Sequence, residues 1–119
     1  MSKQRHQSDL LHGTLNLLIL RAVSGRSLHG ADVASWIAKR SGGEFEIVDA
    51  ALYKALHRLE EAGAIAAREG RSATNRFARF YTLTARGRRL LREQSSAWDR
   101  YAQAVFTVLA PECDREPAR

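Results

Sequence analysis

Hydrophobic residues recur every three or four positions in three stretches of the first half of the chain, and this spacing predicts three helices. The first is expected from Asp9, as its N-terminal cap, to Ala22, and the second over residues 30–38. The third is expected from Asp49, again as the cap, to Ala62. Apolar side chains of the first predicted helix cover more than one face, so we expect it to pack between two partners.

The third predicted helix carries one apolar stripe, formed by Leu52, Leu56 and Leu59. In the second predicted helix, Trp36 is expected in the core. The residues outside the leucine stripe are expected on exposed or flanking faces of the third predicted helix: Ala51, Lys54, Ala55 and Arg58.

Alternating side chains and a turn-rich centre predict a β-hairpin in the second half of the chain. Its strands are expected over residues 64–69 and 76–83, joined by a polar turn at residues 70–75. Thr84 then caps a last predicted helix that extends to about Ala110. At about 1.5 Å per residue this helix is about 40 Å long, which is more than a small domain needs.

Apolar residues in the last predicted helix follow a heptad pattern, which predicts a seam that needs a partner helix. The economical solution is a two-fold homodimer in which the last helices, together with the first helix, pack against their symmetry mates. The residues expected at this dimer interface are Leu11, Leu15, Leu18, Leu91, Gln94, Trp98, Tyr101, Val105 and Val108.

Positive charge is concentrated in the hairpin and the start of the last helix. Between Arg68 and Arg92 there are eight arginines against a single acid, Glu69, so this segment carries a net charge of +7 while the whole chain carries +6. A sequence pI near 10.2 suits nucleic acid, an anionic membrane surface or an acidic protein about equally. A basic hairpin beside a helix is how a winged helix-turn-helix grips DNA phosphates, and this favours nucleic acid.

The composition is that of an ordinary globular protein of one domain, with 119 residues, 45% hydrophobic and 27% charged. The only cysteine, Cys113, cannot form an internal disulfide, and we see no signal-peptide pattern and no apolar run of the roughly 20 residues that a membrane span needs. We therefore expect a cytoplasmic protein without membrane contact.

Together these elements predict a mainly α fold with a small β-hairpin (α+β), a winged helix-turn-helix with a long C-terminal dimerisation helix. Residues 1–8 are expected to be a flexible basic arm and residues 9–83 the DNA-binding domain. Residues 84–110 are expected to form the dimerisation helix and residues 111–119 a tail.

Four stretches, in matching order and spacing, resemble the PadR family of winged-helix transcriptional regulators. They are GTLNLLILRAV (13–23), SLHGADVASWI (27–37), ALYKALHRLEEAGAI (51–65) and RFARFYTLTARGRRLL (76–91). The segments LHG and LYxALxRLE are the specific parts, and a single last helix resembles the small-C-terminal-domain branch. The resemblance implies a homodimeric repressor that binds double-stranded DNA at a near-palindromic operator.

The chain departs from the family pattern around the start of the third predicted helix. It has Asp49-Ala50-Ala51 before the LY pair, where the family has small residues such as Gly-Ser, and Lys54 after it, where the family has proline. Lysine restores a backbone N–H and adds a cation, so target sequence and affinity are expected to differ from those of relatives.

Candidate DNA contacts come from the third predicted helix and from the hairpin. Tyr53 could instead pack in the core beside Leu56, His57 could be merely solvated, and Arg58 could pair with Glu61. A run of charge is also often only a solvated face. The candidates are Tyr53, Lys54, His57, Arg58, Arg71, Asn75, Arg76 and Arg79.

Trp98 and Tyr101 could line a pocket for a small aromatic effector at the dimer interface, as aromatic residues do in some relatives; the alternative is a packed dimer core. The four histidines and Cys113 lack metal-ligand spacing, so no metal or other cofactor is expected. Proximity of Ser27, His29 and Asp32 in the sequence is not the geometry of a catalytic triad, so we do not expect an enzyme. The rival function is a dimeric winged-helix adaptor that does not read DNA.

Overall fold

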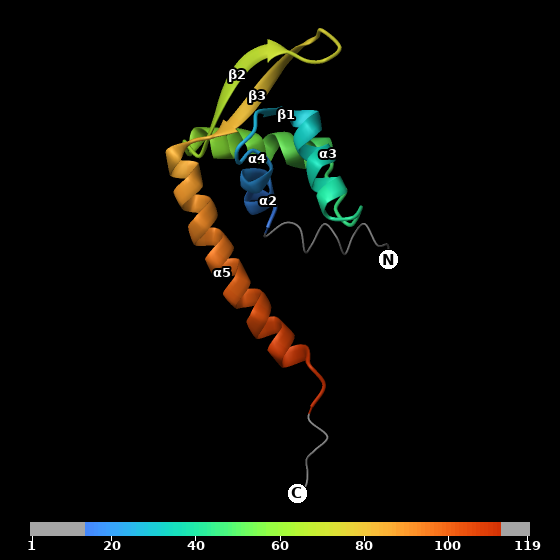
Figure 1. The fold of residues 1–119 in the computed structure, drawn as a ribbon, viewed down its shortest axis with the longest axis vertical. Coiled ribbons are helices and arrows are strands. Elements are labelled where there is room, and N and C mark those ends of the chain that lie inside the picture. Colours follow the sequence, from blue (N-terminus) through green and yellow to red (C-terminus); the bar gives the residue numbers. More distant parts are fainter. Residues whose placement is uncertain (1–13, 113–119) are drawn as a thin grey trace, which may run out of the picture.

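The computed structural model describes residues 14–112 of the chain. A compact body of helices and a hairpin sits at one end of the long last helix, which projects away from it (Figure 1). In chain order the elements are α2 (Leu15–Ala22), β1 (Leu28–His29), α3 (Gly30–Arg40), α4 (Asp49–Glu61), β2 (Ile65–Arg71), β3 (Phe77–Leu83) and α5 (Ala85–Leu109).

The predicted fold class is confirmed. The hairpin β2–β3 is antiparallel, with Ile65 opposite Leu83 at its base and Arg71 opposite Phe77 near its tip. The two-residue strand β1 adds to the other edge of β3, which gives the sheet order β1-β3-β2. The last helix begins after Thr84, as predicted, and the Thr84 side chain accepts a hydrogen bond from the backbone N–H of Gly87.

Two helix starts differ from the prediction. Helix α2 begins at Leu15, and Asp9, its predicted cap, lies outside the described residues. The cap of α4 is Val48, which is extended and accepts a backbone hydrogen bond from Leu52 at 2.9 Å. Asp49 is therefore the first helical residue, where its negative carboxylate interacts favourably with the positive end of the helix dipole.

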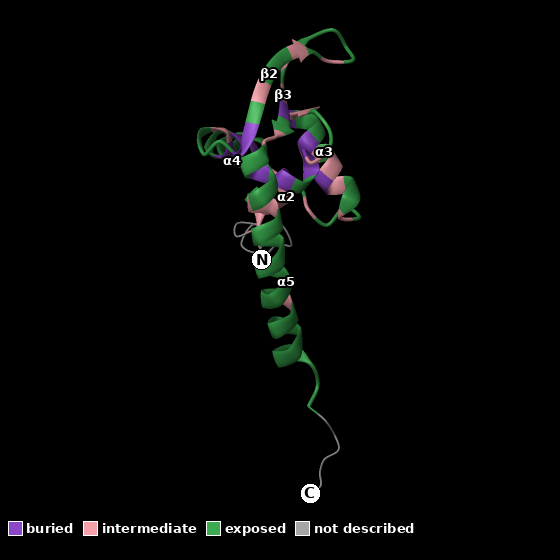
Figure 2. Ribbon diagram, turned by 60° about the vertical axis from the view of Figure 1, so that its left-hand side comes forward, coloured by how far each residue is buried: buried purple, intermediate pink, exposed green. Residues whose placement is uncertain are grey.

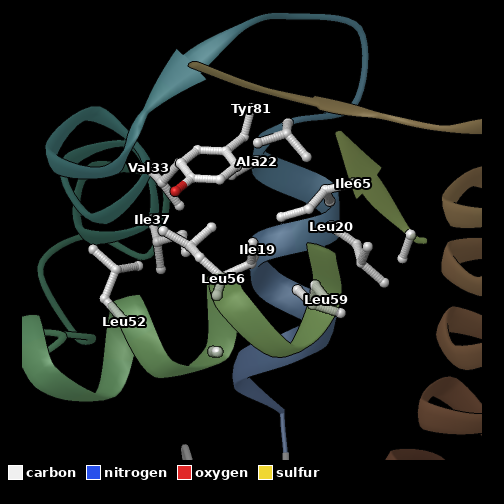
Figure 3. Close-up of a cluster of buried hydrophobic side chains, with 13 residues drawn as sticks. Ile19, Leu20, Ala22, Val33, Ile37, Leu52, Leu56, Leu59, Ile65 and Tyr81 are labelled. Atoms are coloured by element: carbon white, nitrogen blue, oxygen red, sulfur yellow. The ribbon is translucent and has the colours of Figure 1, made fainter. Parts of the chain in front are cut away.

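The core lies between α2, α3, α4 and the base of the sheet (Figure 3). Its largest fully buried side chains include Ile19 and Leu20 from α2, with Leu52 and Leu56 from α4. Ala55, predicted on an exposed or flanking face, is 1% exposed. It belongs to the buried stripe because it lies three residues after Leu52 and four before Leu59 on the same helix.

Trp36, expected in the core, is only half-buried. Its ring packs against the edge of the core, and the guanidinium groups of Arg26 and Arg40 lie 4.8 and 5.7 Å from its ring centroid. An amphipathic ring at this edge can cover apolar surface while contacting cations.

The start of α5 is tied to the end of α4 by a set of contacts that we call the α4–α5 joint: Ala62, Gly63 and Ala64 on one side, Thr84, Arg86 and Gly87 on the other. The Thr84 hydroxyl donates to the Gly63 carbonyl oxygen at 2.6 Å, and the Thr84 N–H donates to the Ala64 carbonyl oxygen at 3.1 Å. Arg86 Nη1 donates to the Ala62 carbonyl oxygen at 2.9 Å. Carbonyl groups of the turn that follows α4 are thus satisfied by the start of α5.

Gly87 lets the two backbones approach at this joint. A Cβ atom at Gly87 would lie 2.7 Å from Leu83 Cδ1 and would overlap the Ala64 carbonyl oxygen. Beyond its first turns, α5 is exposed along its length (Figure 2). In the part of the chain between residues 14 and 112, no helix is long and apolar enough to cross a membrane.

Gly87→Ala is expected to lower the free energy of unfolding by about 1–3 kcal/mol, because overpacking forces the joint apart. At an open helical position the same change would stabilise the protein by about 1 kcal/mol, so the sign of the effect is the test. Urea denaturation followed by circular dichroism measures it. An unchanged or raised stability would show that the joint tolerates a side chain.

Candidate nucleic-acid interface

The solvent-facing side of α4 carries all four of its predicted DNA contacts. Tyr53, Lys54, His57 and Arg58 are exposed, because the buried stripe of this helix occupies the opposite face. Lys54 and Arg58 also border an open groove of about 710 Å³ that runs between α4, the segment 46–48 and the start of α2. A helix with one free, cation-bearing face has the form required to enter a DNA major groove.

Tyr53 packs on α3 rather than beside Leu56 in the core. Its ring lies against Gly30, where an added Cβ atom would come within 2.6 Å of Tyr53 Cε1. The residue is still 49% exposed. Gly30, the glycine of the LHG segment, thus provides the space that fixes the ring at the rim of the exposed face of α4.

The three other α4 candidates differ in their partners. His57 Nε2 lies 3.3 Å from Glu61 Oε2, one helical turn further on. The alternative pairing of Arg58 with Glu61 is wrong, since that carboxylate is directed to His57. Within residues 14–112, neither Lys54 nor Arg58 has a carboxylate within ion-pair distance.

Arg79 connects the wing, the hairpin β2–β3, to α4. Its Nη2 donates to both carboxylate oxygens of Glu60, at 3.0 and 2.7 Å. Hydrogen bonds to Tyr81 and to Glu60, together with the negative charge of Glu60, raise the pKa of Arg79 above its ordinary value. Arg79, predicted as a DNA contact, therefore has its charge balanced within the domain.

The turn at the tip of the wing, residues 71–76, is held closed by hydrogen bonds within the turn. Ser72 N–H donates to the Arg76 carbonyl oxygen at 2.8 Å, and Arg76 N–H donates to Ser72 Oγ at 3.3 Å. Asn75 adopts a left-handed conformation with φ of 63°, which asparagine tolerates better than most residues. Arg71, Asn75 and Arg76 are all exposed here.

The arginines at the tip differ from Arg79 because no carboxylate of the described chain balances their charge. In the described part of the chain, no carboxylate lies within ion-pair distance of Arg71 or Arg76. Among the described residues, the structure therefore places two uncompensated cations at the end of the wing, Arg71 and Arg76, and two on the free face of α4, Lys54 and Arg58.

The predicted dimer seam divides into a covered part and an exposed part. Leu15, Leu18 and Leu91 are half-buried and pack against the core of their own subunit. Leu11 lies outside the described residues. The exposed seam residues, all on α5, are Gln94, Trp98, Tyr101, Val105 and Val108.

Two further apolar residues of α5, Phe106 and Leu109, are 67% and 73% exposed. The rings of Trp98 and Tyr101 lie 5.5 Å apart, centroid to centroid. They border a groove of about 410 Å³ between α5 and the start of α2, which Leu17 and Gln94 also line. The apolar face of α5 is thus broader than the heptad positions alone indicated.

Sequence reasoning missed Glu60 and Phe77. The Glu60 pairing joins residues 19 positions apart in different elements, so no local pattern predicts it. Phe77 shares its strand alternation with the buried Tyr81, yet it is 77% exposed because the wing extends beyond the body of the domain.

The structure gives no support to a metal site or a triad in the region that it describes. Among residues 14–112, no group of three or more His, Cys, Asp or Glu residues could hold a metal ion. His29 caps α3 by accepting a hydrogen bond from the Asp32 N–H at 3.4 Å, and its other ring nitrogen lies 3.3 Å from the Asp32 carboxylate. These contacts give His29 a structural role.

Known proteins share both the sequence pattern and the fold. The family described as "Transcriptional regulator PadR-like family" matches residues 19–93. A curated protein from Lysinibacillus sphaericus, named only as an uncharacterized protein, is 29% identical over 92 residues, which cover 77% of this chain and 84% of that protein.

Solved structures with this fold include a transcriptional regulator from Clostridium thermocellum. It matches with a TM-score of 0.77 at 20% identity, over 87% of this chain and 100% of that one. Bacillus subtilis PadR, solved in complex with operator DNA, matches with a TM-score of 0.60 at 21% identity. That match covers 88% of this chain and 52% of the PadR chain.

Proposed function

Because the chain belongs to the PadR-like family of transcriptional regulators, which is not a family of enzymes, we propose that it is a homodimeric, sequence-specific DNA-binding repressor. The observation that carries this proposal is that one domain has both a free, cation-bearing face on α4 and uncompensated arginines at the wing tip. The Bacillus subtilis PadR structure, which holds operator DNA on the same fold, supports it.

In the proposed complex, α4 enters the major groove and its exposed side chains meet base edges and phosphates. Lys54 and Arg58 are the main α4 contacts in this proposal, because Tyr53 packs on α3 and His57 pairs with Glu61. Arg71 and Arg76 contact the DNA that flanks the half-site, Arg76 at a backbone phosphate, while Arg79 serves to hold the wing against α4.

The exposed apolar face of α5 supports the dimer in this proposal. A helix 25 residues long that exposes Trp98, Tyr101 and Val108 needs a partner surface in water. Pairing two such helices about a two-fold axis would present two copies of α4 to successive major grooves, about 34–36 Å apart, and so select a near-palindromic operator. A dimer that covers a promoter blocks transcription without additional parts, so repression is the simplest outcome.

A ligand response is a second component of the proposal. The groove beside Trp98 and Tyr101 offers two aromatic rings and apolar walls, which suit a small aromatic effector. Such a ligand would release DNA if it bound one relative arrangement of the two α5 helices more tightly than the other. The alternative is that a partner α5 fills this groove completely.

Arg76→Gln is expected to weaken binding to duplex DNA and to reduce the slope of log K against log salt concentration by about 0.9, the value for one lost phosphate contact. Arg79→Gln should change the slope less, since Glu60 already balances that charge. Fluorescence anisotropy at several salt concentrations measures both. Equal effects would contradict the assignment, and binding to no duplex at low salt would favour the adaptor.

Val105→Glu is expected to convert the dimer to monomers, because it places a charge in the apolar seam of α5. Gln103→Glu is the matched control, since Gln103 lies on the opposite side of the same helix and should leave the dimer intact. Sedimentation velocity measures the molar mass of each variant. A dimeric Val105→Glu protein would place the interface elsewhere.

Quenching of Trp98 fluorescence by small aromatic compounds is expected in a Trp36→Phe variant, in which Trp98 is the remaining tryptophan. The reciprocal Trp98→Phe variant, which reports from Trp36, should not respond to the same compounds. If a library of aromatic compounds left the first variant unquenched while it still bound DNA, the groove would be a packed interface and not a ligand site.

A further inference from the structure

Phe77 is the most exposed aromatic side chain in the described part of the chain, at 77% of its accessible surface. It begins β3, directly opposite Arg71 at the end of β2. A large apolar ring in this position gains nothing from the core of its own domain. Arg71 and Arg76 lie in the same turn of the hairpin, and the one acid nearby, Glu69, lies opposite Arg79 and lines the same shallow hollow as Phe77.

The ring of Phe77 and the guanidinium of Arg71 form one unit. Arg71 Cζ lies 4.3 Å from the centroid of the Phe77 ring, within the range of a cation–π contact. Arg71 Nη1 also donates to the Asn75 carbonyl oxygen at 3.2 Å. Two different contacts therefore hold the guanidinium at the tip before any ligand arrives.

This unit lies on the face of the wing that is directed toward α4. Side chains two positions apart on a strand point to the same face, so Phe77 shares its face with Arg79. Arg79 in turn bonds Glu60 of α4. Arg71 and Phe77 therefore lie on the same face of the wing as its contact with α4.

A DNA minor groove that is rich in A·T pairs matches this unit chemically. Such grooves are narrow and strongly negative and attract inserted arginine side chains. Their walls are deoxyribose rings, against which an aromatic side chain can pack, and phenylalanine also serves as a wedge at base steps in minor-groove binders. An acidic protein surface would satisfy the arginines but offers no comparable apolar wall beside each anion.

We propose that Arg71 and Phe77 together select A·T pairs in the minor groove beside each half-site. Arg71 enters the groove, and Phe77 acts as a positioning residue that packs on the sugars and holds the guanidinium. This inference rests on the proposed function, and it adds a source of sequence preference outside the major groove to the phosphate contacts already assigned to the wing.

The test uses a duplex selected for binding from a random pool, with the base pairs beside each half-site replaced by A·T, G·C or inosine·C. Inosine·C presents the minor-groove edge of A·T and the major-groove edge of G·C. The full-length protein should bind the A·T and inosine·C duplexes equally, and each more tightly than the G·C duplex by on the order of tenfold, as for the loss of one base contact.

Variants assign this preference to the two residues. Phe77→Ala, Phe77→Leu and Arg71→Gln should bind all three duplexes nearly equally, since leucine keeps the bulk of the side chain but not the cation–π contact. Arg76→Gln is the matched control at the same tip and should weaken binding to all three duplexes by the same factor. Because Phe77 is exposed, its variants should keep the melting temperature of the parent protein.

Each remaining outcome overturns a defined part of the account. Binding without any flank preference, or a preference that treats inosine·C like G·C, would refute minor-groove selection while the proposed function stands. A preference that survives Phe77→Ala would remove Phe77 from it. Failure to bind any duplex at low salt would instead refute the proposed function itself.

Discussion

The joint between the end of α4 and the start of α5 is the contact on which the proposed mechanism depends. Thr84 and Arg86 satisfy carbonyl groups of the turn that follows α4, and Gly87 allows the two backbones to approach. Because α4 carries the candidate DNA contacts and α5 the apolar seam, this joint, together with α2, which packs on both helices, links the two elements. A change in how two α5 helices pair would then move both copies of α4.

Charge on this domain is divided among structural and available arginines. Arg86 completes the joint, and Arg79 balances Glu60 and holds the wing to α4. Arg71 and Arg76 retain their charge at the tip. A count of charges along the sequence therefore overstates the cationic surface that a ligand meets, and the position of each guanidinium matters more than the total of +6.

Elements with strong local signals were predicted from the sequence. The cap at Thr84, the length of α5 and the hairpin follow from residue types and spacing that act within a few positions. Leu91 shows the limit of such signals. A heptad position indicates that a residue needs an apolar partner, but it does not identify that partner. In the structure, Leu91 packs against the core of its own chain. The Glu60–Arg79 pair and the exposure of Phe77 depend on the tertiary arrangement.

Pulsed electron spin resonance between labels on the two copies of α4 tests the central claim most directly. Ala50→Cys, in a protein whose natural Cys113 is replaced by Ser, provides one exposed label site per subunit. If the joint is rigid, the free dimer gives one narrow distance distribution, and Thr84→Ala broadens it. A broad distribution in the protein with an intact joint, or the absence of any coupling between labels, would contradict the account.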